Sequence, residues 1–182
     1  VHAAALAAGV GRIVVPAVAV DGFARTKNVV ERYPGCVAAY GIHPLYVMAA
    51  RDDDLAVLRD WLAGERPVAV GEIGLDFHVA GIDAARQEFF FVEQLKLARA
   101  FDLPVLLHVR RAIDPVLKQL RRIRVRGGIA HAFNGSRQQA DEFIKLGFKL
   151  GFGGAMTFSG STRIRALAAE LPLDAIVHET EA

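Results

Sequence analysis

The sequence has little cysteine and no long run of apolar residues. Cys36 is the only cysteine among 182 residues, which excludes a disulfide within the chain and fits a reducing compartment. No apolar run approaches the ~20 residues that a membrane-spanning helix needs. We therefore expect a cytoplasmic protein that has no membrane partner.

An excess of charge of one sign is also missing. Lysine and arginine number 22 against 20 acidic residues, so the formal net charge is only +2. This balance excludes a broad cationic surface, although it is compatible with a nucleic acid held at a local site. Apolar residues, in contrast, make up 53% of the chain. That fraction suits one packed domain with strands buried on both faces.

Short apolar segments alternate with amphipathic ones along the chain. Strands are expected at Arg12–Val20, Cys36–Gly41, Pro67–Ile73, Pro104–Val109, Gly128–Ala132, Phe148–Gly153 and Asp174–Glu179. Helices are expected at about Thr26–Tyr33, Asp53–Ala63, Asp83–Phe101, Pro115–Arg122, Ser136–Leu146 and Ser161–Glu170. Strands and helices that alternate in this way are typical of a parallel sheet.

Two architectures have such a sheet, the open doubly wound fold and the (β/α)8 barrel. The doubly wound fold usually carries a glycine-rich phosphate loop after an early strand. Here the first expected strand is followed by Asp21-Gly22-Phe23, and Gly151–Gly154 lacks the spacing of such a loop. A barrel collects its functional residues where strands end. This sequence does the same, which favours the barrel.

Side chains that can bind a metal follow five of the expected strands. They are His43, Glu72, His108, His131 and either Glu179 or Glu181. A single histidine at a strand end is more often structural than a ligand, but the repetition on several strands favours a shared site. Imidazole nitrogens and carboxylate oxygens suit Zn²⁺ and similar divalent ions.

Five linked segments resemble the TatD family of metal-dependent hydrolases. They are AVGEIGLDFH, LPVLLHVRRA, GGIAHAFNGS, GFKLGFGGAMTF and LPLDAIVHETEA, and GIHP at Gly41–Pro44 fits as well. The resemblance implies a (β/α)8 TIM-type barrel with divalent metal ions (Zn, Mg or Mn), two in a complete family site. It also implies hydrolysis of phosphodiester or ester bonds by a metal-activated water, as in 3′→5′ DNases.

The resemblance also assigns roles to single residues. Glu72 matches the glutamate that bridges the two metals, and His108 and His131 match two further metal ligands. Glu181 takes the place of a family aspartate, as a metal ligand and as the catalytic carboxylate that orients or deprotonates the water. Its additional methylene is a departure that displaces the carboxylate by roughly 1.5 Å, a shift large enough to matter in catalysis.

Four more residues are expected to touch substrate or to support the ligands. His43 is expected to line the mouth of the pocket. Asp76 either bonds a ligand histidine or caps its loop. Arg110 and Arg111 follow closely after His108, so one of them can meet a phosphate or carboxylate of the substrate.

The second departure is larger, because the family begins with a strand that carries an H-x-H motif, and this chain has no such pair. We therefore expect residues 1–182 to form a single incomplete barrel, from about strand 2 to strand 8, without strand 1 and the final helix. Its two outermost strands would be open edges. The fragment would bind at most one metal.

The expected function is thus a TatD-type hydrolase of phosphodiester or ester bonds. The alternatives are a truncated, catalytically impaired fragment or non-enzymatic scaffold, and an amidase, lactonase or D-aminoacyl-tRNA deacylase on the same barrel. The expected partners are a nucleic acid or a small ester or phosphoester substrate. No obligate protein partner is evident.

Overall fold

The structure is a computed structural model, and it describes residues 2–180. Its centre is one parallel sheet in which each strand pairs with the next strand along the chain. The strands are β1 (Ile13–Pro16), β2 (Cys36–Tyr40), β3 (Ala69–Asp76), β4 (Val105–Arg110), β5 (Gly128–Ala130), β6 (Phe148–Phe152) and β7 (Ile176–His178). Strands that follow one another in chain order belong to a barrel, whereas a doubly wound sheet reverses direction. The prediction of a TIM-type barrel is confirmed.

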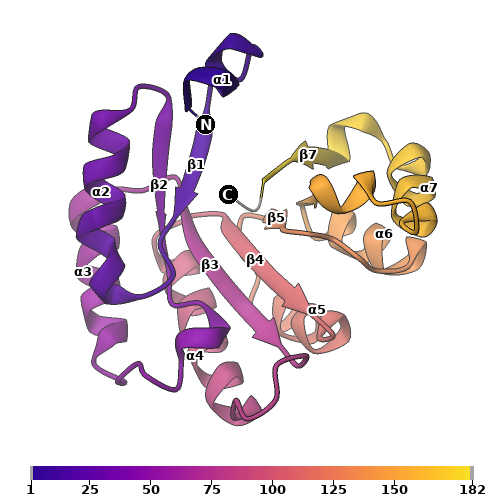
Figure 1. The fold of residues 1–182 in the computed structure, drawn as a ribbon. Coiled ribbons are helices and arrows are strands. Elements are labelled where there is room, and N and C mark those ends of the chain that lie inside the picture. Colours follow the sequence, from indigo (N-terminus) through magenta and orange to yellow (C-terminus); the bar gives the residue numbers. More distant parts are fainter. Residues whose placement is uncertain (1, 181–182) are drawn as a thin grey trace.

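Apart from the first helix, which precedes β1, the helices connect the strands and cover the outer side of the sheet. They are α1 (His2–Ala7), α2 (Phe23–Arg32), α3 (Asp54–Glu65), α4 (Ala84–Ala100), α5 (Ile113–Arg122), α6 (Arg137–Lys145) and α7 (Thr162–Glu170), with short 3₁₀ turns η1 (Val20–Gly22), η2 (Pro44–Tyr46), η3 (Gly154–Thr157) and η4 (Leu173–Ala175). Figure 1 shows a curled sheet, open on one side, with α2 to α4 outside its first half and α5 to α7 outside its second half. Within the described chain, β1 and β7 each pair with one neighbour only, so both are edge strands, as expected.

The first and last strands are shorter than the sequence predicts. After β1, the amide of Ala17 still bonds the carbonyl of Ala39, and the chain then turns through η1 into α2. Asp21 and Gly22 lie in this turn, and both residue types favour turns over strands. The last strand loses its first residues to η4 for a similar reason, since Asp174 lies in that turn.

Strand β3 runs through the middle of the molecule and positions the site. It packs between β2 and β4 on its edges and against α4 on its outer face. Seven of its eight residues are buried, and Glu72 alone is partly exposed. A carboxylate in so buried a strand is costly unless neighbours compensate its charge. Glu72 therefore marks the place where the fold must supply partners.

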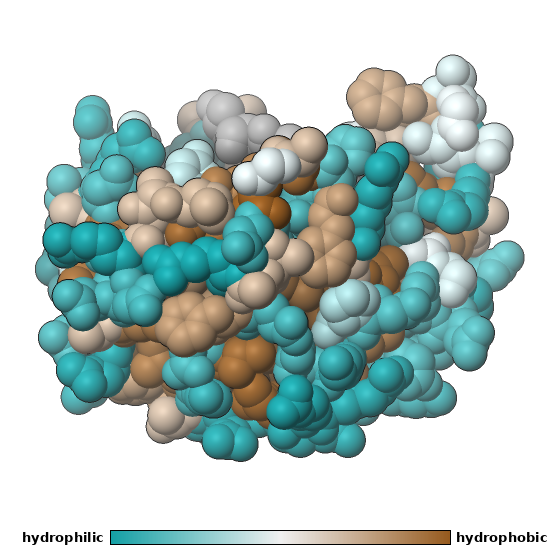
Figure 2. Space-filling view, turned by 90° about the horizontal axis from the view of Figure 1, so that it is seen from below, coloured by the Kyte–Doolittle hydropathy of each residue, from teal (hydrophilic) through white to brown (hydrophobic). Residues whose placement is uncertain are grey.

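The end of the molecule toward which β3 and β4 point in Figure 1 is the face shown in Figure 2. Hydrophilic side chains (teal) and apolar ones (brown) both reach the surface there. Loops that follow β2 and β3 contribute large exposed apolar side chains, among them Tyr46, Met48 and Phe77. Within residues 2–180, none of the helices is both long and apolar enough to cross a membrane.

Candidate metal centre

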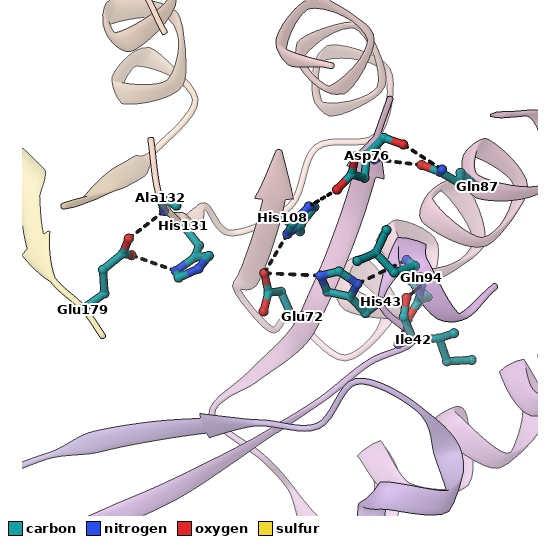
Figure 3. Close-up of polar contacts among 11 residues, drawn as sticks. Ile42, His43, Glu72, Asp76, Gln87, Gln94, His108, His131, Ala132 and Glu179 are labelled. Atoms are coloured by element: carbon teal, nitrogen blue, oxygen red, sulfur yellow. Dashed lines mark hydrogen bonds and ion pairs between the residues drawn. The ribbon is translucent and has the colours of Figure 1, made fainter. Parts of the chain in front are cut away.

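Three side chains, from the loop after β2, the middle of β3 and the second half of β4, meet on the concave side of the sheet. Oε1 of Glu72 lies 3.3 Å from Nδ1 of His108 and 3.7 Å from Nε2 of His43. The ring centroids of His43 and His108 lie 4.3 Å apart. One potential ligand atom from each residue lies within 4.8 Å of the others, as Figure 3 illustrates. The sequence prediction that strand ends bring Glu72 and His108 together therefore agrees with the geometry.

An irregularity in β3 brings Glu72 into this position. The pairing of β3 with β4 shifts register between Val70 and Ile73, and such bulges re-aim side chains. Further along, Gly74 has a φ of 148°, and a Cβ there would overlap the carbonyl oxygen of His108. Only glycine permits this close approach of the two strands.

His108 has a carboxylate at each ring nitrogen. On the side away from Glu72, its Nε2 lies 2.9 Å from Oδ2 of Asp76, which is 1% exposed. Oδ1 of Asp76 also accepts hydrogen bonds from the amides of His78 and Val79. A carboxylate can only accept hydrogen bonds, so both ring nitrogens are called on to donate when no metal is bound, and when a metal takes Nδ1 the remaining proton lies on Nε2, toward Asp76. Asp76 thus sets which nitrogen His108 presents to the site.

The charge state of the site fits a bound cation. In the neutral ring, Nδ1 of His108 and the nearby oxygen of Glu72 are both acceptors, so a proton or a metal ion must lie between them. Burial alone would lower the pKa of His108, but its hydrogen bonds to Glu72 and Asp76 outweigh burial and raise it. Burial alone would raise the pKa of Glu72, and His108 with the neighbouring imidazoles lowers it instead. The donor set suits Zn²⁺ or a similar divalent ion.

His43 lies closer to the centre than a residue at the pocket mouth would. Its Nδ1 accepts a hydrogen bond from the amide of Leu45, so the neutral ring carries its proton on Nε2, which faces Glu72. Burial, followed by the charge of His108, lowers the pKa of His43 to about 4. At neutral pH the ring is therefore uncharged and can donate to Glu72 or to a substrate oxygen. To bind a metal through Nε2, it would have to give up the bond from Leu45.

Two buried glutamines on α4 hold the loops that carry these residues. Gln94 bonds both the amide and the carbonyl of Ile42, the residue before His43, at 2.7 and 3.0 Å. Gln87 bonds both backbone groups of Asp76 at 2.8 Å. The sequence analysis missed both residues. Their spacing of seven, which places two amides on one helix face, is the signal that could have revealed them.

His131 lies on the opposite side of the concave face, paired with Glu179 (Figure 3). Nδ1 of His131 is 2.9 Å from Oε2 of Glu179, and Oε1 of the same carboxylate accepts the amide of Ala132 at 2.7 Å. Glu179 reaches His131 across β6 at Gly151, where a Cβ would overlap Oε2. His131 is not one of the three clustered residues, so its role as a ligand stays a prediction.

The predicted catalytic residue and metal ligand Glu181 lies outside the described residues. The last described carboxylate of that segment, Glu179, was the other candidate that the strand-end pattern offered. The structure places Glu179 in the pocket, as a partner of His131.

These groups share one cavity of about 930 Å³ at the strand ends. Arg110 and Arg111, predicted to meet the substrate, both line it, and so do Asn134 and Arg163. Within residues 2–180, neither Arg110 nor Arg111 forms an ion pair with a carboxylate. The cavity thus offers both a cation-binding cluster and uncompensated positive charge.

The fold and these motifs have close counterparts among known proteins. A family described as TatD related DNase matches residues 1–182. The metal-dependent hydrolase YjjV of Escherichia coli K12 is 43% identical over 179 residues, which cover 96% of this chain and 69% of that protein. The 3′-5′ ssDNA/RNA exonuclease TatD of Cronobacter turicensis is 35% identical over 188 residues, which cover 99% of this chain and 70% of that protein.

A solved structure agrees with both sequence matches. The crystal structure of YjjV, a TatD homologue from Escherichia coli K12, superposes with a TM-score of 0.94 at 41% identity, over 100% of this chain and 71% of that one. The match covers every described strand and helix, the candidate metal cluster included. The chain belongs to the TatD family.

Proposed function

We propose that this protein is a metal-dependent hydrolase that cleaves phosphodiester bonds of nucleic acids, in the manner of a 3′→5′ exonuclease. One observation carries the proposal: Glu72 and Nδ1 of His108 face each other at 3.3 Å, beside the imidazole of His43, in a cavity that arginines also line. The printed name of the Cronobacter relative supports the choice of phosphodiester over other ester bonds.

Glu72 and Nδ1 of His108 are the residues that would hold the metal, with His131 and Glu181 as the further ligands that the family resemblance implies. Lewis-acid stabilisation of an attacked oxygen, and a water of lowered pKa, are the chemistry that a divalent ion supplies at such a site. Asp76 contributes by fixing the orientation and tautomer of His108.

Other residues of the cavity would bind and orient the substrate. His43 is neutral at pH 7 and points its Nε2–H toward the centre, where it can donate to a phosphoryl oxygen. Arg110 and Arg111 follow His108 and can pair with phosphate oxygens, since guanidinium groups match their geometry. Gln94 keeps the loop of His43 in place through its hydrogen bonds to both backbone groups of Ile42.

Hydrolysis assays on two substrates test the proposal. The protein should cleave bis(p-nitrophenyl) phosphate and single-stranded oligonucleotides when Mn²⁺, Mg²⁺ or Zn²⁺ is added, and chelator should abolish both activities. His108→Ala should lose turnover, whereas His178→Ala, which changes an exposed histidine on β7, should keep it. Turnover that survives His108→Ala, or cleavage of carboxylic esters alone, would contradict the proposal.

A further inference from the structure

The cavity has a second end, away from the candidate metal cluster. Arg163 lies in the first turn of α7 and lines the cavity together with Asn134, which follows β5. One guanidinium nitrogen of Arg163 donates to the side-chain oxygen of Asn134. That contact is a single anchor for a side chain with five N–H donors, so most of its donors stay available.

The carboxylates that line the cavity within residues 2–180 already have partners other than Arg163. Glu72 faces His108, Glu179 faces His131, and Asp114 accepts a hydrogen bond of 3.0 Å from the Gln139 amide. Within the described part of the chain, Arg163 forms no ion pair. Its positive charge is therefore directed into the cavity without a compensating group from residues 2–180.

Sheet order separates Arg163 from the candidate metal cluster. Glu72 belongs to β3, whereas α7 follows β6, and three strand spacings lie between these two strands. At about 4.8 Å for each spacing, the backbones of β3 and β6 lie roughly 14 Å apart along the sheet. Arg163 therefore belongs to a different part of the cavity lining than Glu72 and His108. We expect an anion at Arg163 to be a different group from the one held at Glu72 and His108.

We propose that Arg163, anchored by Asn134, binds a second phosphate of the substrate, so that the cavity selects a strand with several phosphates over an isolated phosphodiester. This inference rests on the proposed function, because it takes the metal cluster as the place of cleavage. Arg110 ends β4 and Arg111 follows it, and β4 lies between β3 and β6 in the sheet, so both arginines continue the positive lining of the cavity.

Equilibrium binding of a short fluorescein-labelled oligothymidylate tests this site. Fluorescence anisotropy would be measured in chelator, so that the strand is not cut, at several KCl concentrations. Arg163→Gln keeps a polar group that can bond Asn134 but removes the charge. It should raise Kd about tenfold at low salt, the loss of one charge-assisted hydrogen bond. The slope of log affinity against log salt should decrease in magnitude by roughly 0.7, the value for one phosphate contact on a single strand.

Two further variants separate charge from structure. Arg163→Lys should keep the salt slope, because it keeps the charge. Arg124→Gln changes an exposed arginine that precedes β5, at the other end of the sheet, and should leave Kd and slope as in the wild type. An unchanged slope in Arg163→Gln, an equal loss in Arg163→Lys, or an equal loss in Arg124→Gln would overturn the inference.

The proposed function is tested separately by wild-type turnover of bis(p-nitrophenyl) phosphate with Mn²⁺. Absence of that turnover would refute the phosphodiesterase. If the wild type turns over this substrate, but Arg163→Gln changes neither the Kd of the oligonucleotide nor its salt slope, only the second phosphate site is refuted.

Discussion

Asp76 on β3 and His108 on β4 are joined by a contact of 2.9 Å between Oδ2 and Nε2, and this contact determines which face of the imidazole meets Glu72. Asp76 and Glu72 both only accept, so each calls for a proton from the ring, and when a metal takes Nδ1 the contact with Asp76 holds the remaining proton on Nε2. The candidate metal site therefore depends on a residue that does not itself face the ion.

Asp76→Asn tests this dependence. The amide oxygen of asparagine can still accept the amides of His78 and Val79, but its NH₂ group would donate to Nε2 of His108. The proton would then move to Nδ1, the atom that faces Glu72. We expect metal affinity, measured by calorimetry, to fall about 10- to 100-fold, the usual effect of losing a partner behind a ligand. Unchanged affinity would show that Asp76 only caps its loop.

Gly151→Ala tests the crossing of Glu179 over β6. The new methyl group would overlap Oε2 of Glu179 and push this carboxylate away from His131. We expect a lower melting temperature and weaker metal binding, because the ring of His131 would lose the acceptor that orients it. Gly154→Ala is the matched control, since a Cβ at Gly154 meets no atom within 4 Å and its backbone imposes no positive φ. Equal behaviour of the two variants would contradict this role for Gly151.

The low pKa of His43 predicts a loss of stability in mild acid. Its pKa of about 4 in the folded protein lies below the ordinary value of 6.5. Between these pH values His43 is therefore protonated in the unfolded chain and neutral in the folded chain. Protons then favour the unfolded state, and the free energy of unfolding falls as the pH drops.

Urea unfolding in chelator at pH 7 and pH 5 measures this effect. From pH 7 to pH 5, wild-type protein should lose about 2 kcal/mol more than His43→Gln, which cannot titrate at this position. The comparison with the variant removes contributions that other groups make to both proteins. If both proteins lose the same stability, His43 is not held neutral by its surroundings.

Part of this site could be predicted from the sequence, because the order of strands in a parallel sheet determines which strand ends lie side by side. In a parallel sheet, side chains near the ends of successive strands gather at one end, so Glu72 and His108 were expected to meet. The same reasoning expected His131 beside them, and the structure pairs it with Glu179 instead. The position of His43 could not be predicted in this way, because it depends on how the chain turns after β2. That turn is held by Gln94, a residue 51 positions further along.

The sequence pattern also could not predict which atoms of side chains on neighbouring strands are in contact. The sequence left open whether Asp76 bonds a ligand histidine or caps its loop, and the structure shows that it does both, at Nε2 of His108 and at the amides of His78 and Val79. Likewise, the pattern offered Glu179 and Glu181 as equivalent strand-end carboxylates. The structure shows that the space above Gly151 lets Glu179 reach His131, and Glu181 lies outside the described residues.

The central claim is that Glu72 and His108 form a divalent-metal site, and a calorimetric titration with Zn²⁺ tests it most directly. Wild-type protein should bind the ion, and Glu72→Gln, which has nearly the same shape but no charge, should bind at least roughly 100-fold more weakly, since a carboxylate ligand is lost. Zn²⁺ that binds Glu72→Gln as tightly as wild type would contradict the claim.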